Sequence, residues 1–356
     1  MKVKILPEET KQQIAKLVER KFIEATLKER LPEYYPDFEC LKKLTLDPYK
    51  RHLGVTSAVF VVEYKIEYLN KKGENKLLDL FASAHSDGSR QAAYKKTTFL
   101  YQYGFNQGQY KVTRPLFFLP EQEAFFYEAS IGRSLFNFFT QSPEEDLRPA
   151  FSLVVGWMKK LHNFNPRDFD WPVFRISTMI PLPEKFIKDF YNDNQQQGQI
   201  VDELFQQMQK DENRFNKTIK KTLIYGDNHP ENIIIRDLKA DYLEMIDFTD
   251  VALGDPMIDL GTFLQQFDFM GHNFISREKM NDYKTFFVEN YFQQSFSQIK
   301  IDYLNRINLY QSWTALRSAT FLFYMKDVEN PILDLLHDSQ NYLQLAKQGQ
   351  RIINLH

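Results

Sequence analysis

The stretch TLIYGDNHPENIIIRDLKADYLEMIDFTDVALGDPMIDL, residues 222–260, decides the fold. It contains three short apolar runs, bounded by polar or turn residues, that predict β-strands at 222–225, 232–236 and 242–246. Polar side chains stand at the ends of these runs. Asp227 follows the first run, Asn232 opens the second and Asp247 closes the third. We therefore expect the two carboxylates and the carboxamide to lie at neighbouring strand ends.

These residue types suit phosphoryl transfer, which requires Mg²⁺ ligands and a carboxylate that orients the attacking hydroxyl. Carboxylate and amide oxygens are hard ligands of the kind that Mg²⁺ prefers. Asp227 precedes Asn232 by five residues, which is the spacing of a kinase catalytic loop. Taken singly, Asp and Asn between strands are most often turn formers. The combination, in this order and spacing, predicts a kinase-like site instead.

Two motifs in the stretch resemble one known family. Residues 225–232, YGDNHPEN, resemble the catalytic loop of the aminoglycoside phosphotransferase and choline kinase family. Residues 246–248, IDF, and 254–260, GDPMIDL, resemble the metal-binding segment that follows that loop. The resemblance implies an α+β, two-lobed protein-kinase-like fold, with a small antiparallel β lobe and a mainly helical C-terminal lobe.

The resemblance also implies roles for individual residues. Asp227 would be the catalytic base, and Asn232 and Asp247 would be Mg²⁺ ligands. Asp259 would hold the catalytic loop by hydrogen bonds, and His162, at a helix end, would have a structural role. The implied cosubstrate is ATP, with GTP as the alternative. The implied partner is a small-molecule hydroxyl acceptor of unknown identity.

The first part of the chain, residues 1–128, is expected to form the nucleotide-binding lobe. Helical spacing of apolar residues predicts a helix over 7–31. Alternating apolar and polar residues predict an antiparallel hairpin. The expected elements are that helix, strands at 56–68 and 76–85, a helix at 88–103, and strands at 112–118 and 123–128.

Four residues of this region are candidates for nucleotide binding. Ser57 ends the stretch Gly54–Ser57, where a phosphate-covering loop would lie, although an ordinary strand turn explains its one glycine equally well. Glu128 and Ser130 fall at the expected hinge between the lobes, where backbone groups would bind adenine; an ordinary strand exit is the alternative. Ser83, or a neighbour, falls at the position where the fold usually has a phosphate-binding lysine.

The glutamate that would pair with this lysine is missing too, since Tyr94 falls near its place. The cations that could substitute, each expected to be a solvated surface charge, are Lys76, Lys95, Lys96 and Arg90. Two hypotheses follow. The chain is a small-molecule kinase, or it is a non-catalytic pseudokinase that binds nucleotide or acts as a scaffold. The complete set of expected metal-site residues favours the kinase.

Residues 129–356 are expected to form the mainly helical catalytic and substrate-binding lobe. Apolar stripes at helical spacing predict helices at 133–140, 144–164, 186–209, 282–296, 303–325 and 330–345, the third of them interrupted near 192–199.

Composition narrows the class of protein. The chain has 356 residues with 43% hydrophobic and 26% charged residues, which suits a soluble globular protein. A net charge of −2 gives no general attraction to nucleic acid or anionic membranes, and neither partner is expected. A single cysteine, Cys40, and the lack of an apolar signal segment predict a cytoplasmic protein. No zinc-ligand pattern, GxSxG elbow or Walker A loop is present. The oligomeric state leaves no mark in the sequence.

Overall fold

The structure is a computed structural model that describes residues 5–166, 169–178, 182–217, 219–238, 242–325 and 331–355. By its internal contacts the chain divides into two compact units. One unit holds the chain up to Ile131 together with Glu244–Thr249, and the other holds Gly132–Leu243 and the chain from Asp250 onward. No local sequence signal indicates that Glu244–Thr249 packs with the first unit. The division into domains after residue 128 stays a prediction.

The first unit is built on a five-stranded antiparallel sheet with the order β1-β2-β3-β6-β5. Its strands are β1 (Phe38–Leu53), β2 (Ala58–Asn70), β3 (Asn75–His85), β5 (Pro115–Leu119) and β6 (Ala124–Glu128), and a short strand, β4 (Tyr110–Val112), precedes β5. The alternation predicted for β2 is confirmed, since Phe60, Val62 and Tyr64 are all fully buried on one face.

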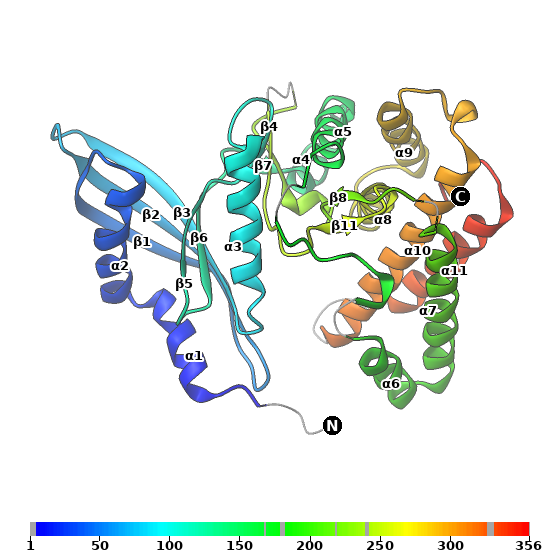
Figure 1. The fold of residues 1–356 in the computed structure, drawn as a ribbon, viewed down its shortest axis with the longest axis horizontal. Helices are drawn as coiled ribbons and strands as arrows, with labels where there is room; N and C mark the ends of the chain where they lie inside the picture. The colour runs from blue at the N-terminus through cyan, green and yellow to red at the C-terminus, as the bar shows by residue number, and fades with distance from the viewer. Residues whose placement is uncertain are drawn as a thin grey trace. The chain divides into compact units, whose positions relative to one another are not determined.

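Helices cover both faces of this sheet, as Figure 1 shows. On one face lie α1 (Glu8–Ala15), a 3₁₀ turn (Lys16–Val18) and α2 (Arg20–Tyr34). The hydroxyl of Tyr64 donates to the carbonyl of Leu17 at 2.7 Å and fixes the 3₁₀ turn to the sheet. On the other face lies α3 (Ser89–Leu100), which ends in a π-helical turn at Tyr101–Phe105. Tyr94 of α3 packs its ring against Phe118 and Phe125.

Three expectations for this unit are corrected. The helix expected over 7–31 is two helices, because the backbone at Glu19 is extended between them. The strand expected over 112–118 is two strands, since β4 ends at Val112 and β5 begins at Pro115. The first strand of the sheet, β1, lies largely in a stretch for which no strand was expected.

The second unit is mainly helical. Its helices are α4 (Leu135–Gln141), α5 (Arg148–His162), α6 (Pro183–Asp193), α7 (Gln195–Phe215), α8 (Met257–Gly271), α9 (Arg277–Phe292), α10 (Ile301–Tyr324) and α11 (Ile332–Gln348). Short 3₁₀ turns lie at Ile176–Thr178, Pro230–Asn232 and Phe296–Gln298. The predicted break near 192–199 is confirmed, because Asn194 ends α6 and caps α7 by accepting the N–H of Gln197.

Short strand pairs position the predicted catalytic stretch. The strands are β7 (Arg133–Ser134), β8 (Thr222–Ile224), β9 (Ile233–Ile235), β10 (Leu243–Met245) and β11 (Ala252–Gly254). Within the second unit β8 pairs with β11, and β7 pairs with β9, both antiparallel. The three strands predicted in residues 222–260 are confirmed as β8, β9 and β10, each shorter than predicted.

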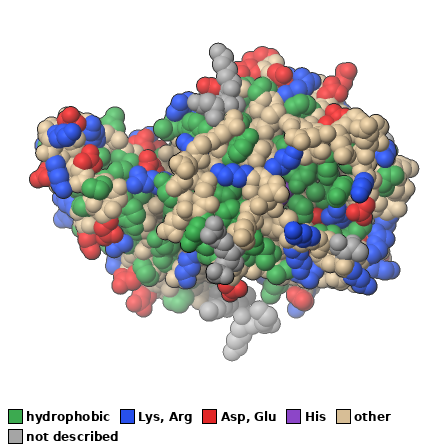
Figure 2. Space-filling model, turned by 45° about the horizontal axis from the view of Figure 1, so that its top comes forward, with side chains coloured by type: hydrophobic (Ala, Val, Ile, Leu, Met, Phe, Trp, Pro, Cys, Tyr) green, Lys and Arg blue, Asp and Glu red, His purple; other side chains and the backbone are tan. Residues whose placement is uncertain are grey.

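Aromatic side chains fill the core of this unit. Phe151 of α5 makes edge-to-face contacts with Phe263 and Phe267 of α8 and with Phe287 of α9, at centroid distances of 5.3, 5.0 and 5.8 Å. None of the described helices is long and apolar enough to span a membrane. Figure 2 shows acidic and basic side chains interspersed on the face it presents, in keeping with the net charge of −2.

Candidate active site

The predicted catalytic loop leaves β8 through a sharp turn at Gly226. This residue has a φ of +82°, which side-chain-bearing residues rarely adopt. A Cβ atom built there would lie 2.8 Å from the carbonyl oxygen of Asp250. Glycine is therefore needed for the loop to pass so close to the backbone at Asp250, and this turn sets the direction in which Asp227 leaves the strand.

A buried carboxylate holds the start of the loop. Asp259 on α8 is fully buried and accepts the backbone N–H groups of Tyr225 and Gly226, each at 2.8 Å. Its Oδ2 atom also lies 2.9 Å from Nε2 of His162, whose Nδ1 is 2.8 Å from the hydroxyl of Tyr291. The structural role expected for Asp259, and the structural rather than catalytic role expected for His162, are in keeping with these contacts.

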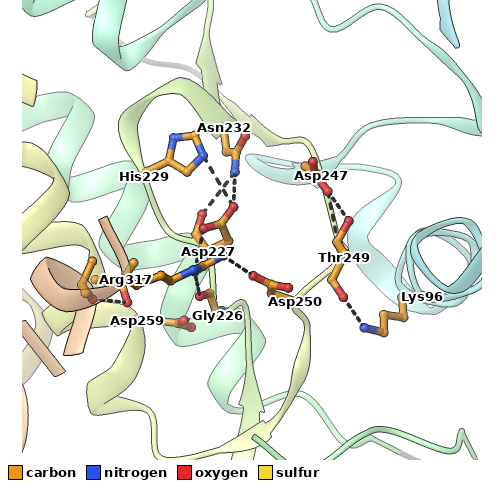
Figure 3. A network of polar contacts seen from close by, with 12 residues as sticks. Lys96, Gly226, Asp227, His229, Asn232, Asp247, Thr249, Asp250, Asp259 and Arg317 are labelled. Atoms are coloured by element: carbon orange, nitrogen blue, oxygen red, sulfur yellow. Dashed lines mark hydrogen bonds and ion pairs between the residues drawn. The ribbon is translucent and has the colours of Figure 1, made fainter. Parts of the chain in front are cut away.

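Asp227 lies among positive groups of the second unit (Figure 3). Its Oδ1 is 3.0 Å from a guanidinium nitrogen of Arg317 on α10, and its Oδ2 is 3.5 Å from Nε2 of His229. Burial by itself would raise the pKa of Asp227, but the charges of Arg317 and His229 outweigh it and hold the pKa well below its usual range. Asp227 is therefore ionised throughout the neutral range.

Arg317 is a site residue that the sequence does not point to. It links Asp227 to Asp250, whose Oδ2 accepts from its Nη2 at 2.7 Å, and its Nη1 also donates to the carbonyl of Gly226 at 3.4 Å. The one signal in the sequence is that Arg317 is a charged residue within a largely apolar helix. This signal does not identify its partner Asp250, which lies 67 residues earlier in the chain.

The side chain of Asn232 is oriented by the same loop. Its Nδ2 donates to the backbone carbonyl of Asp227 at 3.2 Å and to the Asp227 carboxylate at 3.4 Å. These bonds turn the amide oxygen, Oδ1, away from Asp227. The Asn232 backbone N–H donates to the carbonyl of His229 at 3.0 Å, so the loop closes on itself around this residue.

Asp247 belongs to the first unit and has a different setting. It has a φ of +56°, which is uncommon for a residue with a side chain. Nη1 of Arg90 on α3 donates to both carboxylate oxygens of Asp247, at 2.9 and 3.0 Å. The hydroxyl of Thr249 donates to Oδ1 at 2.6 Å, and Lys96 donates to the Thr249 carbonyl, as Figure 3 shows for the last two contacts.

These contacts correct the expectation that Arg90 and Lys96 are solvated surface charges. The Arg90 side chain is 15% exposed, and Lys96 is buried. Both lie on the side of α3 that meets residues 247–249. The expectation holds for the other two cations, since Lys95 is exposed, and Lys76 forms an exposed ion pair with Glu74 at 2.9 Å.

The predicted nucleotide-binding residues all lie in the first unit. Ser57 lies in the turn between β1 and β2, and its carbonyl accepts the N–H of Gly54 at 2.8 Å. Ser83 is buried on β3, the central strand, between Val61 and Phe125. Its short side chain carries no charge, so Ser83 cannot take the lysine's role.

Glu128 and Ser130 lie at the end of β6, as predicted. The backbone N–H of Glu128 donates to Arg114, its carbonyl accepts the Thr113 hydroxyl, and its carboxylate accepts from Tyr35. The hydroxyl of Ser130 donates to Glu244. The Glu128 backbone is thus engaged by neighbouring strands, and adenine binding at this place stays a prediction.

Comparison with known proteins bears on this arrangement. Residues 126–286 match the model of the phosphotransferase enzyme family. An ethanolamine kinase from Plasmodium vivax is similar in structure, with a TM-score of 0.58 and 13% identity over 97% of this chain and 96% of that one. This chain has the fold of the small-molecule kinases. The α+β, protein-kinase-like fold predicted from the sequence, and the resemblance carried by residues 222–260, are confirmed.

Two further structures show the same fold. A choline kinase from Streptococcus pneumoniae has a TM-score of 0.52 and 13% identity, over 90% of this chain and 99% of that one. An aminoglycoside phosphotransferase solved with streptomycin and ATP has a TM-score of 0.51 and 12% identity, over 93% and 98%. No curated protein sequence matches the chain. The enzyme class expected from the sequence, a small-molecule phosphotransferase, is that of the matched family.

Proposed function

We propose that this small-molecule kinase fold catalyses the transfer of the γ-phosphoryl group of ATP to a hydroxyl group of a small molecule, in a reaction that depends on Mg²⁺. The observation that carries the proposal is the ordered catalytic loop. Asp227 and Asn232 lie on one loop, five residues apart in the sequence, and hydrogen bonds from Asn232 to Asp227 fix their side chains. The loop lies within the segment that matches the phosphotransferase family. Solved structures of the same fold that contain AMP-PNP or ATP support the choice of cosubstrate.

Asp227 acts as the group that orients the acceptor. The acceptor hydroxyl donates its hydrogen bond to the Asp227 carboxylate, and its oxygen attacks the γ-phosphorus as the bond to the ADP oxygen breaks. Because the pKa of Asp227 is held low, the carboxylate is a weak base. Its main contribution is therefore orientation, which suits a loose transition state in which little proton transfer is needed early.

The residues present fit a magnesium ion. Asn232 Oδ1 and the Asp247 carboxylate are hard oxygen donors, and the bonds from Asn232 Nδ2 to Asp227 leave Oδ1 facing elsewhere. No group of three His, Cys, Asp or Glu side chains gathers among the described residues. The chemistry that bound Mg²⁺ supplies is neutralisation of charge on the transferred phosphoryl group. Asn232 and Asp247 belong to different units, so their joint ligation of one ion is part of the proposal.

The test supplies the wild-type protein and an Asp227→Asn variant with ATP or GTP and with each of a panel of hydroxyl compounds. The consumption of nucleotide is measured for each compound. We expect at least one acceptor to be phosphorylated with Mg·ATP, and Asp227→Asn to lower kcat by about 10³-fold or more while Mg·ATP still raises the melting temperature. A wild-type protein whose melting temperature does not respond to millimolar Mg·ATP would contradict the proposal.

A further inference from the structure

The contact between Arg90 and Asp247 joins α3 to the segment Glu244–Thr249 within the first unit. Arg90 is in the first turn of α3, and Asp247 is 157 residues later in the chain. One guanidinium nitrogen of Arg90, Nη1, donates to both carboxylate oxygens of Asp247. It also donates to the hydroxyl oxygen of Thr249 at 3.0 Å. Burial would lower the pKa of Arg90, but the Asp247 charge outweighs it, so the guanidinium stays charged.

The hydrogen-bonding capacity of Arg90 exceeds these contacts. A guanidinium group has five N–H donors in a planar fork. Three acceptors share Nη1, while Nε is buried and donates to no atom of the described residues. A buried donor without an acceptor costs free energy unless a ligand or water satisfies it. Arg90 thus holds both a charge and hydrogen-bond donors that its protein partners do not use up.

The neighbouring cations cannot take this part in the same way. Ser83 is too short, and Lys76 and Lys95 are exposed. Lys96 donates to the carbonyl of Thr249 and so contacts the backbone of the 247–249 turn. Arg90 contacts both carboxylate oxygens of the predicted metal ligand, Asp247.

We propose that Arg90 replaces the missing lysine of β3: it binds the nucleotide phosphates from α3 and, when no nucleotide is bound, it is the counter-ion of Asp247. This inference rests on the proposed function, because it concerns the same nucleotide site. A divalent ion and the guanidinium compete for the Asp247 carboxylate. Arrival of a metal-bound nucleotide removes the competition, because the phosphates give Arg90 new acceptors. Arginine suits this role, since its fork matches phosphate oxygens.

The competition predicts effects of opposite sign on two ligands. In Arg90→Gln the affinity for Mg·ADP, measured by titration calorimetry, falls about 10- to 100-fold, because charged hydrogen bonds to the phosphates are lost. The affinity for Mn²⁺ alone, measured by electron paramagnetic resonance, rises by a factor of about two to ten, because Asp247 no longer has a competing cation. Arg90→Lys keeps the charge and recovers part of the Mg·ADP affinity.

Lys95→Gln is the matched control, since it removes an exposed cation from the same helix, and it leaves both affinities within twofold of wild type. A purely structural ion pair would make Arg90→Gln weaken Mg·ADP and Mn²⁺ together, or change neither, and either result overturns the inference. If Arg90→Gln does not fold, Arg90→Lys decides: we expect its Mg·ADP affinity to lie below that of wild type, and an unchanged Mg·ADP affinity is the contrary result. A wild-type protein that binds no Mg·ADP contradicts the proposed function instead.

Discussion

The carboxylate of Asp259 allows a quantitative test of how the catalytic loop is held. Its Oδ1 accepts the N–H of Gly226, and its Oδ2 accepts the N–H of Tyr225 and faces His162. In Asp259→Asn, the best placement of the amide keeps its oxygen at the Oδ2 position. The amide NH₂ group then faces the N–H of Gly226, so two donors oppose each other inside the protein.

The expected loss of stability follows from these contacts. One buried N–H without an acceptor costs about 1–3 kcal/mol. Two further hydrogen bonds lose the assistance of a charge, which costs about 1 kcal/mol each. The sum is about 3–5 kcal/mol, a large fraction of the roughly 5–15 kcal/mol by which native proteins are usually stable.

Urea unfolding followed by tryptophan fluorescence is the suitable assay. The three tryptophans, Trp157, Trp171 and Trp313, all belong to the second unit, so the signal reports the unit that contains Asp259. We expect the urea midpoint of Asp259→Asn to fall by about 1–2 M. The control is Asp282→Asn, which changes an exposed carboxylate and should stay within about 0.5 kcal/mol of wild type. An Asp259→Asn protein whose free energy of unfolding lies within about 1 kcal/mol of wild type would refute the reasoning, because a loss that small is close to that of an ordinary surface change.

Two other changes test the electrostatics of the second unit. Arg317→Gln should raise the pKa of Asp227 and shift the acidic limb of kcat/KM to higher pH, since the charge that lowers this pKa is removed; a pH–rate profile unchanged from wild type would contradict this. Burial raises the pKa of Glu212 to about 7 from 4.5, so the native state favours the neutral acid, and the stability this gives is present below pH 4.5 and lost as the pH rises through 7. Glu212→Gln keeps the acceptor for the N–H of Ile176 and has no charge to bury. Its free energy of unfolding relative to wild type should therefore rise by about 2–3 kcal/mol from pH 4.5 to pH 8, measured by urea unfolding at both pH values. A difference that does not depend on pH would count against a buried neutral acid.

How much could be predicted from the sequence differs between central and edge elements. The strand β2 alternates along most of its length because one of its faces is buried, and such a pattern is readable without a structure. The strand β1 lies at the sheet edge and is mostly exposed, so burial does not impose the same pattern on it. It contains Pro48 and several lysines, which natural edge strands use against aggregation and which obscure a strand signal.

The catalytic loop could be predicted because its residues are close in sequence. Asp227 and Asn232 lie on one loop, and the loop needs Gly226 for its turn. The partners of the carboxylates could not be predicted in the same way. Arg90 and Arg317 lie on helices that are distant in sequence from their partners Asp247 and Asp227. In the sequence, a single arginine on a helix cannot be distinguished from an ordinary surface charge.

The proposed role of Arg90 explains why the lysine and its glutamate partner are both absent. In the usual arrangement a glutamate on the helix holds the lysine that binds the phosphates. Removing one member of a buried ion pair is costly, because the other charge is left without a partner. Here the helix itself carries the cation, so a second acid on that helix would have nothing to hold. Without nucleotide, Asp247 takes the place of the absent glutamate as the partner of the cation, and the same carboxylate is the expected metal ligand once nucleotide binds. The non-catalytic alternative depended on a missing cation. If Arg90 binds the phosphates as we propose, that reason is lost.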